Sequence, residues 1–246
     1  MRISFVIPAH NEAKSIGNCL SSILRELKRG RYHAEIIVVD NASTDDTAEI
    51  AMRYPGVMVV RERTKGLVHA RQAGFAASTG DLVAHVDADT MLTPGWLETV
   101  RKEFGRDPKL VCLSGPFIYY DLTPRARRLT RMFYRIAFCI YLMNRFVLRI
   151  SSMVQGGNFV VRRKALRAIG GFDTRISFYG EDTDIAKRLI KVGKVKWTFR
   201  LPIYTSGRRL AAEGVLTTGA RYAINYFWVS LFGRPRTRTY QDIRRT

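Results

Sequence analysis

Two carboxylates one residue apart, Asp87 and Asp89, follow a short and mostly apolar segment at residues 82–86. A run of this length after a Gly-Asp pair is typical of a buried strand. In an open parallel sheet, ligands bind just beyond the carboxyl ends of the strands. Mg²⁺ or Mn²⁺ held by a couple of carboxylates and by substrate phosphates is the usual chemistry of such a pair. The spacing therefore predicts a divalent cation site, and the alternative is a solvated turn.

Polar residues also follow the first two strands that the sequence predicts. Residues 9–12 form a polar loop after the first strand, and Asp40 ends the second. A carboxylate at a strand end can accept hydrogen bonds from a nucleobase N–H or a ribose hydroxyl. The alternatives are structural. Asp40 could form a turn with the region of Ser43, and Asn11 or Glu12 could merely begin the next helix.

Two basic residues, Lys65 and Arg71, flank the start of a predicted helix at residues 66–78. The first turn of a helix presents unpaired backbone N–H groups, which makes it a natural place for phosphate. The two side chains are therefore predicted to lie near a phosphorylated ligand. The alternative is a solvated basic face.

A second acidic pair, Glu181 and Asp182, stands at the predicted start of a helix in the basic half of the chain. A carboxylate at a helix start is often only a partner of the helix dipole. It can equally serve as a general base, because an exposed helix start gives reach to the proton that is removed. Arg188, about two helical turns later, could pair with these acids or with phosphate.

Strands and helices alternate from the first residue to about Phe104, which predicts a doubly wound, mostly parallel sheet in three layers. The acids and polar loops should then meet at its carboxyl edge. Pro8 is predicted to end the first strand, and Thr93 and Pro94 to cap and open the helix at 94–104. Other predicted strands cover residues 5–7, 35–40, 57–60, 82–87, 110–119, 156–161 and 195–199, and other helices cover 16–27, 47–54, 66–78, 124–150, 162–169, 181–190 and 219–232.

The formal net charge of the 246 residues is +20, and the acids crowd into the first half. Such an imbalance suggests nucleic acid, an anionic membrane or a phosphorylated substrate as partner. No segment reaches the ~18 to 20 apolar residues of a spanning helix, and the first residues lack the pattern of a signal peptide. The three scattered cysteines show neither disulfide nor zinc spacing, which predicts a cytoplasmic protein.

Four motifs, taken in order, resemble the family 2 glycosyltransferases of the GT-A fold: residues 7–12, residues 38–45, Asp87-Ala88-Asp89, and residues 180–184 with Arg188. The resemblance covers roughly residues 1–209. It implies a mostly parallel α/β sheet flanked by helices, with a basic helical C-terminal part. It also implies a UDP- or GDP-linked sugar donor, inversion at the anomeric carbon, and a glycan or lipid-linked acceptor of the cell envelope.

The same resemblance implies a role for each motif. Residues 1–108 would bind the nucleotide-sugar, 109–209 would carry the acceptor and catalytic groups, and 210–246 would form an amphipathic helix and basic tail, with 1–209 as one continuous domain. Asp87 and Asp89 would bind the metal, and Asp182 would be the catalytic base, with Glu181 as the second candidate. The implied nucleotide-sugar contacts are Pro8, Ala9, Asn11, Glu12, Asp40, Lys65, Arg71, Asp87, Ala88, Gly157, Asn158, Arg188, Arg208 and Arg209.

One departure from the family pattern concerns the metal. Many members supply a late His as a further metal ligand, but all four His of this chain lie in its first half. Residues 205–209 occupy the late position, and their two arginines, Arg208 and Arg209, could neutralise a diphosphate instead. The resemblance thus implies Mg²⁺ or Mn²⁺ but leaves the metal dependence open.

Two other functions compete. A phosphatase of the haloacid dehalogenase type also places Asp-x-Asp after an apolar strand, with the first Asp as nucleophile. That strand normally opens the chain, whereas strand–helix units precede it here, and Met91 stands where a Thr or Val is expected. A non-enzymatic nucleic-acid binder would explain the charge. The acidic motifs would repel a phosphate backbone, however, and no nucleic-acid motif is found.

The segment at residues 124–150 carries seven arginines and no acid, interleaved with aromatic and aliphatic residues. An Arg in the middle of a bilayer costs at least ~2.5 kcal/mol, so a spanning helix is disfavoured. A basic aromatic helix lying in the interface fits better. The C-terminal helix, followed by Arg234, Arg236 and Arg238, repeats the pattern. These helices predict peripheral attachment to the inner face of the membrane, and the alternative is packing on the sheet or on another subunit.

Overall fold

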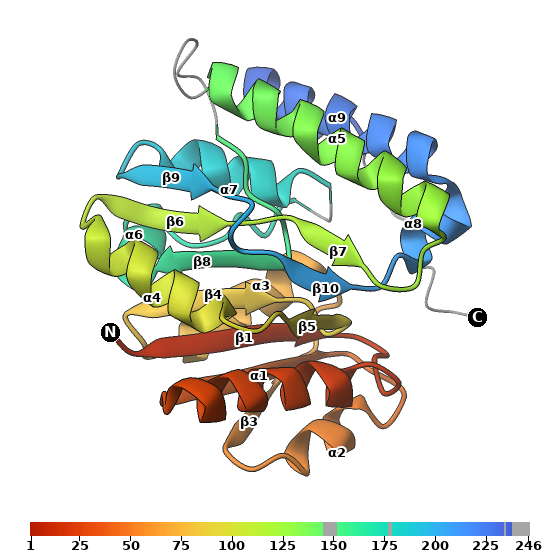
Figure 1. The fold of residues 1–246 in the computed structure, drawn as a ribbon. Helices are drawn as coiled ribbons and strands as arrows, with labels where there is room; N and C mark the ends of the chain where they lie inside the picture. The colour runs from red at the N-terminus through yellow and green to blue at the C-terminus, as the bar shows by residue number, and fades with distance from the viewer. Residues whose placement is uncertain (145–151, 177–178, 234, 238–246) are drawn as a thin grey trace.

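The computed structural model describes residues 1–144, 152–176, 179–233 and 235–237. Its centre is a seven-stranded sheet in the order β3-β2-β1-β4-β8-β6-β9 (Figure 1). Only β8 runs antiparallel to its neighbours in this sheet. The predicted mostly parallel α/β fold is therefore confirmed. The strands are β1 (Ile3–Ala9), β2 (Ala34–Asn41), β3 (Val57–Glu62), β4 (Leu82–Val86), β6 (Leu110–Ser114), β8 (Asn158–Arg162) and β9 (Lys194–Trp197).

Helices cover both faces of this sheet. Alternate residues of a strand point to opposite faces, so Ile7 of β1 packs in one core and Val6 in the other. The core around Ile7 is covered by α1 (Ile16–Gly30), α2 (Thr47–Met52) and α4 (Trp96–Arg106). The core around Val6 is covered by α3 (Leu67–Ala77), α6 (Arg163–Ala168) and α7 (Glu181–Leu189).

A second, three-stranded sheet has the order β5-β10-β7, made of β5 (Thr90–Leu92), β10 (Ile203–Thr205) and β7 (Phe117–Tyr119). The prediction of one strand over residues 110–119 was wrong, because β6 ends at Ser114 and β7 joins the other sheet. Gly115, between the two strands, lets the chain pass close to the backbone of Leu201, since a Cβ there would lie 2.0 Å from the carbonyl oxygen of Leu201.

Two predicted element ends were also wrong. The strand β1 continues through Pro8 to Ala9 and pairs there with β2. On its other side, the pairing of β1 with β4 ends at Val6. The missing N–H of Pro8 is tolerated because Pro8 has no strand partner on that side among the described residues. Helix α4 begins at Trp96 after Gly95, rather than at Pro94 with Thr93 as its cap. The carboxylate of Glu26, from α1, accepts hydrogen bonds from the backbone N–H of Gly95 at 3.0 and 3.1 Å and so takes the capping role.

Three further helices belong to the C-terminal half: α5 (Pro124–Met143), α8 (Arg208–Glu213) and α9 (Val215–Phe232). The side chain of Thr123 caps α5 by accepting a hydrogen bond from the N–H of Ala126 at 3.3 Å. The prediction extended α5 to residue 150, and residues 145–151 lie outside the described part. Helix α9 begins four residues before the predicted Gly219, and α8 was not predicted.

Helices α5 and α9 lie side by side at the top of Figure 1. Tyr134 and Tyr141 of α5 are buried against Trp197 of β9. Helix α9 packs on α7, where the Nζ of Lys187 donates to the carbonyl oxygens of Val229 at 3.3 Å and of Ser230 at 2.8 Å. Within the part of the chain that the structure describes, no helix is long and apolar enough to cross a membrane.

The contact between α3 and β1 makes a testable prediction. A Cβ at Gly74 would lie 2.2 Å from Cγ1 of Val6, so Gly74→Ala should overpack this core and destabilise the protein by ~1–3 kcal/mol. The control is Gly105→Ala in α4, where a Cβ would meet nothing within 4 Å, and it should stabilise by up to ~1 kcal/mol. Urea denaturation measures both. Equal free energies of unfolding for the two variants would contradict the tight packing of α3.

Candidate active site

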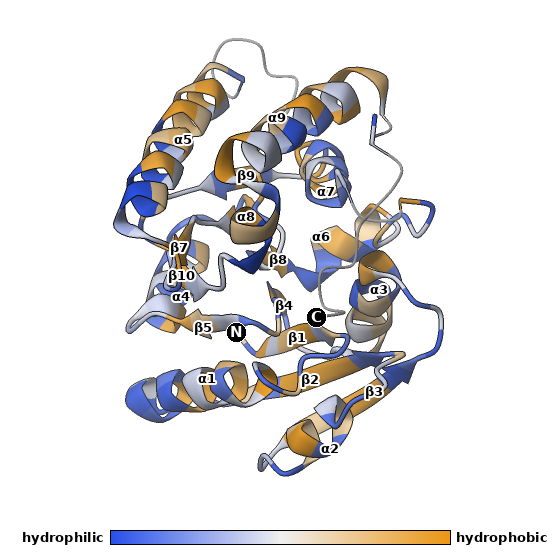
Figure 2. Cartoon of the chain, turned by 90° about the vertical axis from the view of Figure 1, so that its right-hand side faces the viewer, coloured by the Kyte–Doolittle hydropathy of each residue, from blue (hydrophilic) through white to orange (hydrophobic). Residues whose placement is uncertain are grey.

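The predicted site residues meet at one edge of the sheet. Strands β1, β2 and β4 run parallel, with Ala9 in register with Asp40 and Val6 with His85. Their carboxyl ends therefore share an edge, and Asp87 follows β4 there. Figure 2 looks onto this edge, which α3 and α7 flank on one side and β5 and α4 on the other. The sequence correctly placed the loop after β1, Asp40 and the Asp-x-Asp pair together.

Arg71 lies at the centre of this edge. Its Nη2 donates to Oδ1 of Asp87 at 3.1 Å, and its Nη1 donates to Oε1 of Glu181. The Arg71 side chain is only 1% exposed, and its guanidinium lies over the ring of Phe159. The solvated basic face that was one interpretation of Arg71 is therefore wrong. Sequence reasoning did not pair Arg71 with Glu181, because 110 residues separate them.

Glu181 and Asp182 begin α7 but differ in accessibility. Glu181 is buried, whereas Asp182 is half-buried. An Asp182 oxygen accepts from the N–H of Gly156 at 3.4 Å and the other from the N–H of Thr183 at 2.8 Å. Burial raises the pKa of Glu181 to about 7, while Arg71 acts in the opposite direction. Burial also raises the pKa of Asp182. Asp182 is therefore the more accessible carboxylate, with a raised affinity for a proton.

A glycine pair separates these acids from Asp87. A Cβ at Gly157 would lie 2.0 Å from Oδ2 of Asp87, and a Cβ at Gly156 would lie 2.8 Å from Oε1 of Glu181. Gly157 also has a φ of +81°, which favours glycine. Only a loop without side chains can pass here, and this passage brings the backbone of residues 156–157 against both acidic groups.

Asn158, the next residue, does not fit its predicted role in binding the nucleotide-sugar. Its side chain is buried, its Oδ1 accepts from Nε1 of Trp96 at 3.1 Å, and its Nδ2 donates to the carbonyl oxygen of Leu201 at 2.8 Å. The amide is thus engaged in linking β8 to α4 and to the segment before β10. The family resemblance implied a place near the donor sugar and did not show that β8 turns this side chain inward.

Glu12, Asp89 and Arg208 form a second charged cluster. Arg208, the first residue of α8, donates through Nη1 to Oε2 of Glu12 at 3.1 Å and contacts the other Glu12 oxygen through Nη2. The same Nη2 lies 3.1 Å from Oδ2 of Asp89. Arg209 points elsewhere, and its Nη1 lies 3.0 Å from Oε1 of Glu213. The two late arginines, predicted as a pair, therefore have different partners.

The loops after β1 and β2 are tied together by side chains. Asn11, with a φ of +53°, accepts through Oδ1 from the N–H of Thr44 at 2.8 Å and donates through its own N–H to Oγ of Ser43 at 3.1 Å. Oδ1 of Asp40 accepts from the N–H of Ser43 at 3.3 Å, so the turn proposed as a structural role for Asp40 is present. These bonds fix the polar loop beside Pro8 and Ala9.

Lys65 is exposed on the loop between β3 and α3. Asn41 holds this loop, since its Nδ2 donates to the carbonyl oxygen of Thr64 at 2.8 Å and its Oδ1 accepts from the N–H of Gly66 at 2.7 Å. Sequence reasoning missed Asn41, although its place directly after the strand-ending Asp40 was a signal.

Arg188 does not pair with Glu181 or Asp182 as was suggested. Its Nη2 lies 2.6 Å from Oδ2 of Asp184, and its Nη1 donates to the carbonyl oxygens of Ile169 at 2.9 Å and of Gly171 at 2.6 Å. The helix spacing explains the error, because Asp184 is four residues before Arg188 and therefore on the same face of α7. The guanidinium holds the loop that follows α6.

The carboxylates fit a divalent cation in one specific way. No group of three or more His, Cys, Asp and Glu that could hold a metal occurs among the described residues. Asp87 and Asp89 remain, and Mg²⁺ is commonly bound by one or two carboxylates with substrate phosphates completing its shell. These two carboxylates therefore fit a cation whose remaining ligands are oxygens of a bound diphosphate.

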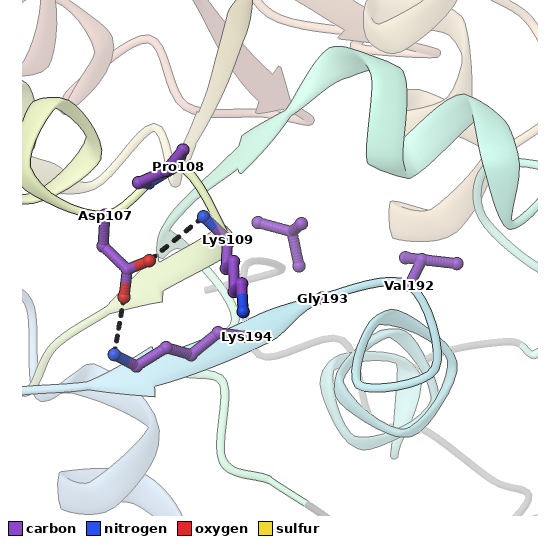
Figure 3. A pocket seen from close by; sticks show the side chains of 7 residues that line it. Asp107, Pro108, Lys109, Val192, Gly193 and Lys194 are labelled. Atoms are coloured by element: carbon purple, nitrogen blue, oxygen red, sulfur yellow. Dashed lines mark hydrogen bonds and ion pairs between the residues drawn. The ribbon is translucent and has the colours of Figure 1, made fainter.

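A hollow of about 460 Å³ lies far from these residues (Figure 3). It is found at the opposite edge of the sheet, where β6 and β9 begin. Oδ2 of Asp107 accepts there from Nζ of Lys194 at 2.6 Å. This hollow has no part in the candidate site. Its lining residues are Asp107, Pro108, Lys109, Val111, Val192, Gly193 and Lys194.

Comparison with known sequences gives a family match. The sequence pattern described as "Glycosyl transferase family 2" matches residues 4–170, which is more than half of the chain. The probable glycosyltransferase YdaM of Bacillus subtilis is 29% identical over 205 residues, which cover 78% of this chain and 47% of that protein. The chain spans less than half the length of the curated relatives it matches.

Solved structures of similar fold were also found. One is the mannosyltransferase PcManGT of Pyrobaculum calidifontis in complex with GDP-Man and Mn²⁺, with a TM-score of 0.65 and 21% identity, covering 88% of this chain and 62% of that chain. Another is the glucosyl-3-phosphoglycerate synthase of Mycobacterium tuberculosis in complex with Mn²⁺ and UDP-Glc. Its TM-score is 0.65 at 21% identity, and the match covers 96% of this chain and 80% of that chain. At this identity the likeness establishes the GT-A fold.

The buried charges around Arg71 predict a stability effect. Arg71→Met would leave Glu181 and Asp87 without their counterion and should destabilise the protein by ~3–5 kcal/mol in urea denaturation. The loss should shrink as the pH falls, because a protonated Glu181 needs no counterion. The control is Arg175→Met, which breaks an exposed pair with Asp173 and should lose at most ~1 kcal/mol. Equal losses would show that Arg71 is not a buried counterion.

Proposed function

The chain belongs to glycosyl transferase family 2, and from this we propose that it transfers a sugar from a UDP- or GDP-linked donor to an acceptor hydroxyl or lipid phosphate with inversion at the anomeric carbon. The acceptor is proposed to be a glycan or lipid-linked molecule of the cell envelope. Membership of this family makes the chain a glycosyltransferase, which replaces the phosphatase and nucleic-acid-binding hypotheses.

One observation carries the proposal. The N–H of Gly156 donates to Asp182, while Gly157 is packed against the carboxylate of Asp87. A carboxylate suited to a cation on the donor's diphosphate and a carboxylate suited to the acceptor's proton thus lie on the two sides of a two-residue loop. Transfer requires that both reactants be held in contact in the right orientation, and this loop supports such an arrangement.

The donor is proposed to lie along the carboxyl edge of the sheet. Ala9, Glu12 and Asp40 would line the nucleoside pocket, whose loops Asn11 holds through Ser43 and Thr44. The diphosphate would lie near Asp87 and Asp89, within reach of the exposed Lys65. When bound there, a divalent cation held by Asp87 and Asp89 would supply positive charge to the leaving diphosphate. Asp87 would also contact the ribose. The other residues of the proposed binding region are Pro8, Ala88, Arg208 and Arg209.

Asp182 is the proposed base. It would take the proton from the acceptor hydroxyl while the hydroxyl oxygen forms a bond to the anomeric carbon and the bond to the diphosphate breaks. Its half-buried position leaves it more accessible than Glu181, and its raised pKa suits proton acceptance nearer to neutral pH. Glu181 is buried and bonded to Arg71, so it orients the start of α7. An acceptor phosphate, already ionised, would need no base.

This assignment predicts the behaviour of Asp182→Asn. With a hydroxyl acceptor, turnover should fall on the order of 10²–10⁴-fold, while donor affinity measured by calorimetry should change little. As the pH is lowered, the wild-type rate should fall when Asp182 becomes protonated. Because burial raises the pKa of Asp182, this fall should occur above the ordinary Asp pKa of 3.8. The rate of the Asp182→Asn variant should not show this fall. Asp107→Asn, at the opposite edge, is the control.

The outcomes separate the possible roles of Asp182. Turnover would be followed with a panel of UDP- and GDP-linked sugars, which also identifies the donor. A collapse of donor binding in Asp182→Asn would place this residue in the pocket and move the base to Glu181. Unchanged turnover with an active donor would argue for a phosphate acceptor.

The enzyme is also proposed to attach to an anionic membrane through α5 and α9. The inner face of α5 packs on β9, whereas its outer face exposes Met132, Phe133 and Ile136 beside arginines. Helix α9 exposes large apolar side chains along much of its length, and Figure 2 shows both helices at the same end of the molecule. The exposed arginines of α5 are Arg125, Arg127, Arg128, Arg131 and Arg135, and the exposed large apolar residues of α9 are Leu216, Tyr222, Ile224, Phe227, Leu231 and Phe232.

A vesicle experiment tests this attachment. The protein should sediment with anionic vesicles more than with neutral ones, and less at high salt, because each Arg near an anionic surface contributes ~1 kcal/mol. Leu231→Ser with Phe232→Ser should weaken binding to both. The control is Met52→Ser with Met58→Ser, which removes exposed apolar residues near α2 and β3. Equal, negligible binding to both vesicle types would favour packing against another protein.

A further inference from the structure

The segment that presents Arg208 is fixed to the fold. The N–H of Gly207 donates to Oδ1 of Asp121 at 2.5 Å, and Oγ of Ser206 donates to Oδ2 of the same carboxylate at 2.6 Å. The carbonyl oxygen of Thr205 accepts from the N–H of Tyr120 at 3.2 Å. The backbone before Arg208 is therefore anchored on the loop between β7 and α5, and the long side chain spans from there to Glu12 and Asp89.

The two carboxylates that Arg208 contacts come from different loops. The side chain of Glu12 is 2% exposed and that of Asp89 is 15% exposed, whereas Arg208 itself is 34% exposed. A carboxylate as buried as Glu12 needs a counterion, and Arg208 supplies it. The same Nη2 lies 3.1 Å from Oδ2 of Asp89. A positive charge thus occupies one side of the carboxylate proposed to bind the cation.

We propose that Arg208 and the divalent cation compete for Asp89, so that the cation binds weakly until a nucleotide diphosphate draws the guanidinium away. The inference rests on the proposed function, since it takes Asp89 as a metal ligand. Two cations a few ångströms apart on one carboxylate repel each other. A guanidinium matches phosphate oxygens with two parallel hydrogen bonds as well as it matches a carboxylate. Arg208 can therefore exchange Asp89 for the diphosphate.

This exchange couples the two ligands. A diphosphate that engages Arg208 removes the competing charge from Asp89, and the cation then binds more tightly. Because coupling of binding free energies is reciprocal, the cation must strengthen diphosphate binding by the same factor. Arg208 is thus a positioning residue that makes cation and donor bind together, in keeping with a site that offers the cation only two carboxylates.

Titration of the free enzyme with MnCl₂, followed by the electron paramagnetic resonance signal of free Mn²⁺, tests the proposal. Without nucleotide, Arg208→Gln should bind Mn²⁺ at least about five-fold more tightly than the wild type. Adding UDP or GDP should tighten Mn²⁺ binding in the wild type much more than in the variant. The double variant Glu12→Gln/Arg208→Gln should behave like Arg208→Gln and avoids leaving a buried carboxylate uncompensated.

Two controls make the outcomes distinct. Arg106→Gln removes the same charge from an exposed residue at the opposite edge of the sheet, where α4 ends, and should leave Mn²⁺ affinity unchanged. Adding Asp89→Asn to Arg208→Gln should abolish the increase in Mn²⁺ affinity that Arg208→Gln produces. If Arg208→Gln and the double variant bind Mn²⁺ no more tightly than the wild type while Asp89→Asn loses binding, the competition is overturned and the metal role of Asp89 stands. If Asp89→Asn leaves the gain intact, the proposed metal site itself is wrong.

Discussion

The buried guanidinium of Arg71 is the interaction on which the rest of the site depends. It comes from α3 and contacts Asp87 after β4 and Glu181 at the start of α7. A buried charge without its partner costs several kcal/mol, so these contacts hold the three elements to one another. The glycine pair at residues 156–157 follows from this constraint, because any side chain there would strike Asp87 or Glu181.

Two arginines at this edge work in different surroundings. Arg71 is 1% exposed and cannot exchange its partners without opening the core, whereas Arg208 is 34% exposed and faces solvent on one side. The first therefore fixes the start of α7, on which Asp182 stands. The second lies where a ligand can reach it. In the proposed function, Arg71 would hold the side of the site that carries the base, and Arg208 would face the incoming donor.

The sequence predicted the sheet and its acidic edge well, because alternating strands and helices dictate a parallel sheet and parallel strands end together. It failed where the structure depends on distant partners. The capping of α4 by Glu26, the ion pair of Arg71 with Glu181, and the inward turn of Asn158 all join segments far apart in the chain. Strands β5 and β10 have three residues each, too few for a periodic pattern to be recognised.

The net charge of +20 had been compatible with nucleic acid, membrane or phosphate, and the structure separates its arginines by location. Arg71 and Arg208 neutralise acids of the site, while those of α5 face outward. The exposed helices are not isolated from the site, since Lys187 of α7 holds the C-terminal carbonyl groups of α9. In the proposed function, α7 thus joins the base Asp182 to a membrane-facing helix, so an acceptor embedded in that membrane would arrive beside the base.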